Sequence, residues 1–165
     1  MKRKMTDTYC IIGLGRFGSA VATFLAENGC EVMVIDKNEA KVRSMRKYTD
    51  MGFVTDDLSV ENLREMGVGN CTTCIICIGE KLDVNMLAAL NAITLGVGRV
   101  IAKAVTEEHG MLLEKIGVES IFPEREMGIR LLAEETGDTY GRTVIFYPEN
   151  GDYVIRTVGK PEKVI

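Results

Sequence analysis

The sequence has no tryptophan, three prolines and one histidine among its 165 residues, and only 6% of the residues are aromatic. It also lacks a basic excess. The formal net charge is −4, whereas nucleic-acid binders normally carry a positive balance that neutralises phosphates, so we expect no nucleic acid among its partners. Nowhere do about 18 apolar residues run together, so no membrane-spanning helix is predicted. The length leaves no room in this chain for a dehydrogenase with a separate substrate half.

Cysteine and histidine are the residues that first suggest a metal site. There are five cysteines, an odd number, and no secretory-signal pattern, so we expect a reducing, cytoplasmic compartment. Cys71, Cys74 and Cys77 form C-x-x-C-x-x-C, a spacing that suggests zinc or an iron–sulfur cluster. In a strand, however, Cys71 and Cys77 would point to one face and Cys74 to the other, so we expect buried apolar thiols instead. His109 is expected on a helix surface.

Strand and helix patterns alternate along most of the chain. Continuous apolar runs predict strands buried on both faces over residues 9–12, 31–36, 52–54, 73–78, 99–104 and 119–122. The segments between and after them predict helices over about 16–28, 38–47, 59–66, 82–95, 107–115 and 124–134. Parallel strands need crossover connections, so the predicted fold class is α/β, with a doubly wound parallel six-stranded Rossmann-like sheet.

The pattern changes after Gly137. Residues 143–147 and 153–158 alternate in polarity and flank a turn-rich stretch containing Asn150-Gly151, which predicts a short C-terminal β-hairpin. We therefore expect two domains, a Rossmann-like domain over residues 1–137 and a hairpin extension over residues 138–165.

The strongest chemical signal is a glycine loop followed by an acid. Residues 13–18, G-L-G-R-F-G, fit G-x-G-x-x-G between a predicted strand and a predicted helix. Gly13 permits a tight turn, Gly15 lets backbone approach a pyrophosphate, and Gly18 lets the helix pack closely. Asp36 ends the second predicted strand, where its carboxylate can accept hydrogen bonds from an adenosine ribose and would repel the 2′-phosphate of NADP. The alternative is that the glycines only form a turn and Asp36 caps the next helix.

Two cations extend this prediction. The Arg16 guanidinium can meet phosphate oxygens in its own subunit or across an interface, although a solvated arginine is the alternative. Lys103 interrupts the apolar strand predicted at 99–104 and lies near its carboxyl end, where ligands of such sheets bind. A lysine that reaches solvent from the sheet edge is the alternative.

Several longer segments resemble a known family. The segments at 11–18 (I-I-G-L-G-R-F-G), 34–36 (V-I-D) and 109–128 (H-G-M-L-L-E-K-I-G-V-E-S-I-F-P-E-R-E-M-G) are similar to the RCK, or KTN, family. Its members are cytoplasmic nucleotide-binding regulators of potassium channels and of Trk/Ktr-type potassium transporters. The resemblance covers about residues 9–134. It implies a non-catalytic sensor that binds NAD/NADH or ATP/ADP, forms a homodimer or higher ring, and changes shape beneath a membrane pore.

The resemblance also assigns residues. It implies that the glycine loop and Asp36 hold the nucleotide, that Arg16 reaches phosphate near the dimer interface, and that Glu124 lies near a bound cation. The family often has G-D-A-T-D after the third strand, where this chain has G-F-V-T-D at 52–56, so an acid is expected to be missing there. The full set of candidate nucleotide-binding residues is Gly13, Leu14, Gly15, Arg16, Phe17, Gly18, Asp36, Lys37, Thr55, Asp56 and Lys103.

The predicted function is therefore a cytoplasmic regulatory subunit or domain that gates a potassium channel or transporter and lies against the inner face of the cell membrane through that partner. The alternative is a small NAD-dependent oxidoreductase, but the sequence has no Tyr-x-x-x-Lys pair, no well-placed histidine and no substrate domain. The predicted helix at 82–95 has a wide apolar surface, with Leu82, Met86, Leu90 and Ile93 on one stripe. Such a surface could serve both the sheet and a partner, or could be buried within one subunit.

Overall fold

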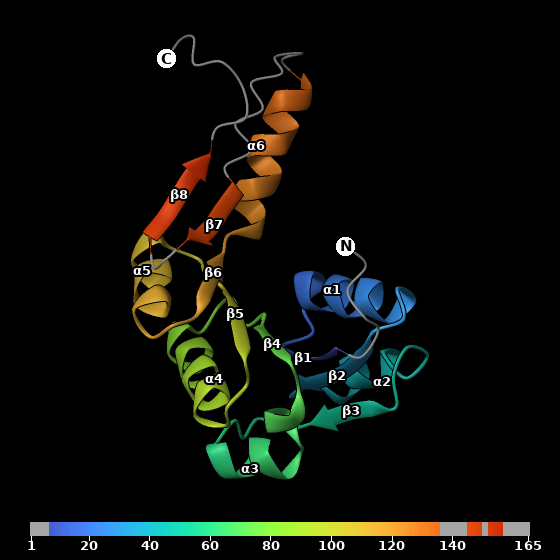
Figure 1. Ribbon diagram of the computed structural model, residues 1–165. Helices are drawn as coiled ribbons and strands as arrows, with labels where there is room; N and C mark the ends of the chain where they lie inside the picture. Colours follow the sequence, from blue (N-terminus) through green and yellow to red (C-terminus); the bar gives the residue numbers. More distant parts are fainter. Residues whose placement is uncertain (1–6, 136–144, 150–151, 157–165) are drawn as a thin grey trace. The chain divides into compact units, whose positions relative to one another are not determined.

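The computed structural model describes residues 7–135, 145–149 and 152–156 (Figure 1). The chain separates into two compact units, Met1–Ile121 and Phe122–Ile165. The first unit contains a six-stranded sheet with the order β3-β2-β1-β4-β5-β6, and every neighbouring pair is parallel. Its strands are β1 Thr8–Ile12, β2 Glu31–Asp36, β3 Met51–Val54, β4 Thr73–Ile76, β5 Arg99–Lys103 and β6 Glu119–Ile121. The doubly wound Rossmann-like sheet is confirmed.

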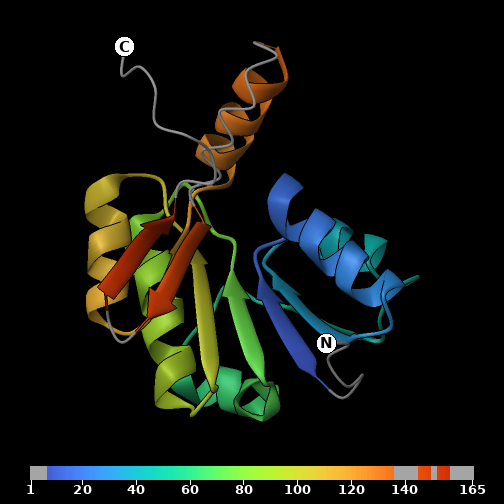
Figure 2. The ribbon, with the colours of Figure 1, turned by 45° about the horizontal axis from the view of Figure 1, so that its top comes forward.

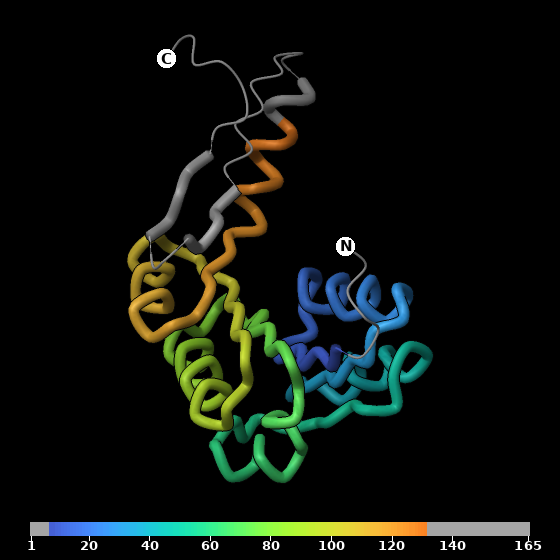
Figure 3. Tube along the Cα trace, viewed as in Figure 1, coloured from blue at the N-terminus to red at the C-terminus, as the bar shows by residue number. Residues whose placement is uncertain are grey.

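The direction of the crossovers decides which helices cover each face. Right-handed connections step outward from β1 to β3 in one direction and from β4 to β6 in the other, so their helices lie on opposite faces. Figures 1 and 2 show α1 and α2 on the first face and α4 and α5 on the second. Figure 3 traces the passage between the two halves, from β3 through α3 to β4. The helices of this unit are α1 Arg16–Glu27, α2 Glu39–Ser44, α3 Val60–Glu65, α4 Leu82–Thr94 and α5 Glu107–Lys115, with a 3₁₀ turn at Val68–Asn70.

This topology determines where on the sheet a ligand can bind, which is the edge formed by the carboxyl ends of the strands. The strand order reverses between β1 and β4, and ligands of such sheets bind outside the carboxyl ends of the strands at this switch point. The strands that meet there are held by buried apolar side chains. Ile11, Val34 and Ile75 face Ala22 of α1 and Val42 of α2 in one core cluster. The positions of the strand ends are therefore set by packing over the length of the sheet.

The second unit contains α6 Pro123–Glu135 and the strands β7 Ile145–Glu149 and β8 Asp152–Arg156. Pro123 is the first residue of α6, a position where its missing N–H has no helical partner to lose. β7 and β8 pair antiparallel, which confirms the predicted hairpin. The predicted domain boundary near Gly137 lies outside the described residues and stays a prediction.

Helix α4 buries one face and leaves its leucines exposed. Its buried residues are small or polar: Asn85, Ala88, Ala89, Asn91 and Ala92. Leu87 and Leu90 are instead 51% and 47% exposed. The alternative that this apolar surface is buried within one subunit is therefore wrong, because alanines let the helix lie close to the sheet and leave Leu82 and Leu90 on the outer face. Its use by a partner stays a prediction.

His109 is buried in α5. Its side chain is only 2% exposed, so the expectation of a helix-surface position is wrong. Thr106 caps α5 by accepting a hydrogen bond from the His109 N–H (3.1 Å), and this start places His109 one turn before the fully buried Leu113, on the same face. Neither ring nitrogen has a hydrogen-bond partner among the described residues. Burial lowers the pKa of His109.

The buried imidazole predicts an acid-sensitive stability. In the unfolded chain the ring protonates near its ordinary pKa of about 6.5, while the folded protein keeps it neutral to lower pH. The contribution of the neutral His109 side chain to the free energy of unfolding is therefore complete above about pH 6.5, and it is lost as the pH falls toward the pKa of the folded protein. We expect the free energy of unfolding of the wild type to fall more steeply from pH 7.5 to pH 5 than that of His109→Gln. Parallel denaturant titrations would measure this, and superimposable pH profiles would contradict it.

The cysteine arrangement also differs from the prediction. Cys71 precedes β4 and is not part of its alternation, so the expected opposite orientation of Cys71 and Cys74 is wrong. Interactions with the Cys71 and Cys74 side chains, together with burial, raise the pKa of the Cys10 thiol. Cys77 packs instead with Ile75 in the cluster beneath α1 and α2. The described residues contain no group of three or more histidine, cysteine or acidic side chains arranged to hold a metal ion.

Candidate functional site

The glycine loop has three distinct geometries. Gly13 has φ +98°, a left-handed conformation that favours glycine, and its N–H donates to the Ile35 carbonyl (2.9 Å). A Cβ at Gly18 would lie 1.9 Å from the Gly13 oxygen, so α1 packs directly on the loop. Gly15 is the N-cap of α1, and a Cβ there would meet no atom of the described residues within 4 Å. The loop thus presents open backbone and the amino end of a 12-residue helix on its outer side.

Asp36 holds this loop in place. Its carboxylate accepts a hydrogen bond from the Leu14 N–H (2.6 Å) through one oxygen and from the Asn38 N–H (2.8 Å) through the other. The cap of α2 is Asn38, which accepts from the N–H groups of Ala40 and Lys41. Asp36 is therefore not a simple helix cap. Each carboxylate oxygen keeps a second lone pair that can accept a hydroxyl hydrogen from a ligand.

The end of β3 adds two acids to the same edge. Gly52, Phe53 and Val54 lie inside β3, so the acid that the family often has and this chain lacks falls within the strand, at Phe53. The residues that follow the strand are Thr55, Asp56 and Asp57. The Thr55 N–H donates to the Asp36 carbonyl (3.1 Å), which ties this segment to β2. Thr55 Oγ1 accepts from the Asp57 N–H (3.0 Å) and from Asn62 Nδ2 (3.2 Å). Asp56 is exposed.

The remaining predicted residues divide into cations and packing residues. Arg16 and Lys37 are exposed at the carboxyl ends of β1 and β2, and Lys103 is half-buried at the end of β5. Leu14, by contrast, is 2% exposed, and Phe17 packs against the core cluster. At these two positions the side chains point into the protein. The edge therefore combines oriented backbone, three cationic side chains and the acids at the ends of β2 and β3, a set suited to a phosphorylated ligand with hydroxyl groups.

Two residues lie beneath this edge at positions that the sequence did not predict, although Cys77 was expected to be a buried thiol. Cys77 lies directly under the glycine loop, because a Cβ at Gly18 would be 3.0 Å from the Cys77 Cβ. Burial raises the pKa of Cys77 to about 12, so the thiol is protonated and acts as packing. Asn85 is fully buried in α4 and bridges the ends of β4 and β5. An asparagine within the apolar pattern at 82–95 was the available signal for it.

Glu124 belongs to the second unit, near the start of α6, and its side chain is exposed. The cation that the family resemblance places near it stays a prediction.

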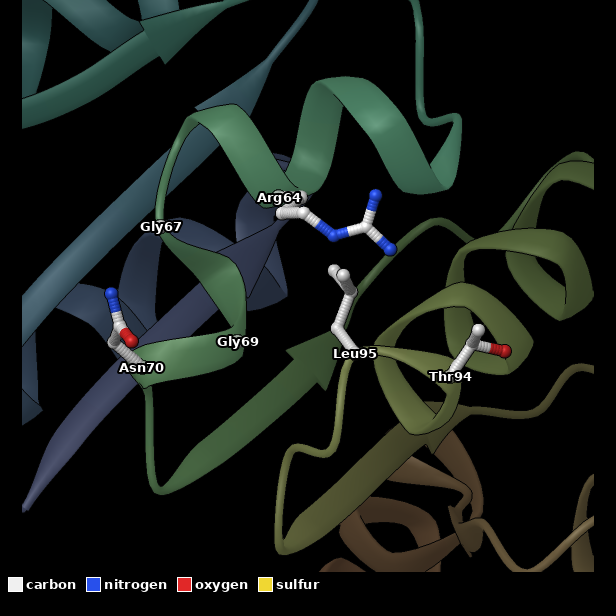
Figure 4. A pocket seen from close by; sticks show the side chains of 6 residues that line it. All are labelled: Arg64, Gly67, Gly69, Asn70, Thr94 and Leu95. Carbon is white, nitrogen blue, oxygen red and sulfur yellow. The ribbon is translucent and has the colours of Figure 1, made fainter.

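A hollow of about 350 Å³ lies at the opposite edge of the sheet. Figure 4 shows Arg64 extending from α3 toward Leu95 and Thr94 at the end of α4. Gly67, Gly69 and Asn70 complete its lining. Because helices that follow parallel strands run back toward the amino ends, this hollow is distant from the glycine loop and forms no part of the candidate site.

The part of the chain that the structure describes holds no helix with the length and apolar character needed to cross a bilayer.

Comparison with known proteins identifies the family. A family model described as the TrkA-N domain matches residues 9–124, which include the glycine loop and Asp36. The chain belongs to the TrkA-N domain family. This confirms the resemblance to the RCK or KTN family. Over 128 residues, this TrkA-N chain is 35% identical to the Ktr system potassium uptake protein C of Bacillus subtilis (strain 168), covering 77% of this chain and 58% of that relative. The chain thus spans little more than half the length of that relative.

Solved structures agree with the TrkA-N assignment. The TrkA-N domain of the inner membrane protein ybaL from Escherichia coli superposes with a TM-score of 0.67 at 17% identity, covering 80% of this chain and 98% of that chain. At that identity the likeness shows the fold. GsuK in a structure bound to ADP superposes with a TM-score of 0.61 at 26% identity, covering 78% of this chain and 33% of that chain.

Proposed function

We propose that this chain is a cytoplasmic nucleotide-binding regulatory domain or subunit that gates a potassium channel or transporter. The observation that carries the proposal is the bond between the Asp36 carboxylate and the Leu14 N–H, which joins the ribose-recognising acid to the phosphate-binding loop at the switch point of the sheet. A TrkA-N relative named as a potassium uptake protein supports the transport role.

The proposed ligand is an adenine nucleotide, either ATP/ADP or NAD/NADH. Asp36 would accept the ribose hydroxyls, the open backbone at Gly15 would meet the phosphates, and Asp56 lies where it could contact the adenosine end. Arg16, Lys37 and Lys103 supply positive charge for the phosphates. The GsuK structure with ADP supports this class of ligand. A 2′-phosphate beside Asp36 would bring like charges together, so NADP is the disfavoured nucleotide.

Regulation requires that different nucleotides stabilise different conformations. A ligand shifts a conformational equilibrium only through its difference in affinity for the two states. In the proposed site, that difference arises at the phosphates, because ATP, ADP and NADH share the adenosine part but differ beyond it. The chain's cationic side chains at the β1, β2 and β5 ends are the groups that would sense this difference.

Calorimetric titration of the purified protein with ATP, ADP, NADH and NAD tests the proposal directly. We expect at least one of them to bind with one site per chain, and NADP to bind about tenfold or more weakly than NAD, which is the effect of roughly 1.4 kcal/mol of repulsion. Absence of binding by all four would contradict the proposed function. Substantial turnover of NAD with a panel of alcohols would instead favour the small oxidoreductase.

The proposed regulator is a homodimer or a larger ring. Leu87 and Leu90 on α4 and Met111 and Leu112 on α5 are each about half exposed, and α4 contacts α5. Exposed apolar side chains gathered on adjacent helices are typical of a protein interface. We expect sedimentation at micromolar concentration to show a dimer or larger species and Leu87→Glu to shift it toward monomer. Phe24→Glu, at an exposed apolar side chain of α1, is the control. A monomeric wild type would contradict the expectation.

A further inference from the structure

Asn85 makes an unusual connection between two strand ends. Its side chain is fully buried in the second turn of α4. The Nδ2 group donates one hydrogen bond to the Ile78 carbonyl (2.6 Å), just beyond the end of β4, and one to the Lys103 carbonyl (3.1 Å), at the end of β5. A single amide group thus links the carboxyl ends of two neighbouring strands to the helix that follows the first of them.

The orientation of this amide is fixed by chemistry. Both groups that face Nδ2 are carbonyls, which accept hydrogen bonds, so only the NH₂ side of the amide satisfies them. As a result, Oδ1 is buried and has no hydrogen-bond partner among the described residues. An unpaired buried acceptor is costly, and a leucine or alanine would avoid it. The two hydrogen bonds from Nδ2 to backbone carbonyls therefore explain an asparagine at this position better than packing does.

The segments that Asn85 holds adjoin the candidate nucleotide site on both sides. A Cβ at Gly13 of the glycine loop would lie 3.1 Å from both the Cys77 carbonyl carbon and the Ile78 nitrogen, so the turn after β4 packs against the loop. On the other side, the Lys103 Nζ lies 3.5 Å from the Cβ position of Gly79 in the same turn. The ammonium group therefore folds back over the turn whose carbonyl Asn85 binds.

We propose that Asn85 is a positioning residue of the nucleotide site, which holds the turn at 77–79 and the end of β5 so that the Lys103 ammonium group faces the phosphates. The inference rests on the proposed function, since it assumes a nucleotide at the glycine loop. Asn85 itself does not contact the ligand. It acts by fixing two backbone carbonyls, and through them the turn and the lysine that pack at the loop.

The test measures phosphate-dependent affinity in Asn85→Ala. Titration of the full chain with ADP, and competition by adenosine, separate phosphate contacts from adenosine contacts. We expect Asn85→Ala and Lys103→Met each to weaken ADP binding about tenfold, the size of one lost charge-assisted hydrogen bond, and adenosine binding less than about twofold. In the Lys103→Met background, Asn85→Ala should add little further loss, because the lysine that it positions is gone.

Asn91→Ala is the matched control. Asn91 is also a buried asparagine of α4, and its Nδ2 donates to the Leu58 carbonyl (2.7 Å), but it lies two turns away from the strand ends. It should lower thermal stability without a change in the ratio of ADP to adenosine affinity. If Asn85→Ala does not fold, Asn85→Ser, which keeps one donor, should show the same selective loss at smaller size.

The outcomes separate the two levels of the proposal. If the wild type binds no nucleotide, the proposed function and this inference both fail. Two other results would overturn the inference while the proposed function stands. In the first, the wild type binds ADP but the Asn85 variants lose adenosine and ADP affinity equally. In the second, the loss of ADP affinity in Asn85→Ala adds fully to the loss in Lys103→Met. In either case Asn85 has only a structural role.

Discussion

Asp36→Ala should weaken nucleotide binding by about a hundredfold, or roughly 3 kcal/mol. Two losses combine in this variant. The ribose hydroxyls lose a charged acceptor, and the N–H groups of Leu14 and Asn38 lose the carboxylate that orients them. The second loss loosens the glycine loop even before a ligand arrives, so the effect should exceed that of a single ribose contact.

Calorimetry with ADP and NADH would measure the change, with Glu31→Gln as the control. Glu31 begins the same strand at the opposite edge of the sheet, where its carboxylate accepts from the Thr8 hydroxyl (3.1 Å). It should leave both affinities unchanged. Asp36→Asn should retain one of the two backbone bonds and lie between the wild type and Asp36→Ala, since an amide offers one acceptor oxygen. Equal affinity in Asp36→Ala and the wild type would refute the assignment of Asp36.

The sheet and the glycine loop were predictable because their sequence signals are local. A strand buried on both faces requires a continuous apolar run, and Glu31–Asp36 shows this directly in its four consecutive buried residues. The three loop glycines were assigned separate roles, and Gly13 and Gly18 have the turn and the close contact that those roles require. The role of Asp36 was predicted from its position at the end of the strand that follows the glycine loop and its helix.

The errors occur where tertiary contacts outweigh local pattern. Helical periodicity in 82–95 does not say which side of the helix faces the sheet. The small residues face it because they allow the helix to lie closer to the strands. His109 follows two glutamates and reads as polar, yet the cap at Thr106 fixes its rotation inward. The bridge from Asn85 to Lys103 spans 18 positions and depends on β4 and β5 being neighbours. No spacing rule in the sequence expresses that contact.

Gly18→Ala should be the most destabilising single substitution in the loop. The added Cβ would lie 1.9 Å from the Gly13 carbonyl oxygen and 3.0 Å from the Cys77 Cβ. Overpacking usually costs about 1–3 kcal/mol, and here the obstacle is backbone that cannot rotate away, so we expect the upper end of that range or more. For a chain of this size that corresponds to a fall in Tm of roughly 10 °C.

Gly15→Ala separates binding from stability at the same loop. In the part of the chain that the structure describes, its Cβ would meet nothing within 4 Å, and the residue has φ −70°, which alanine adopts without strain. The Tm should therefore stay within about 2 °C of the wild type. The new methyl group would nevertheless occupy the space where the pyrophosphate is proposed to approach the backbone, so ADP binding should fall about tenfold or more. Thermal melts and calorimetry on both variants measure the contrast. Because the two glycines are three residues apart on one loop, a Gly15→Ala protein that binds ADP normally would place the phosphates elsewhere on the sheet edge.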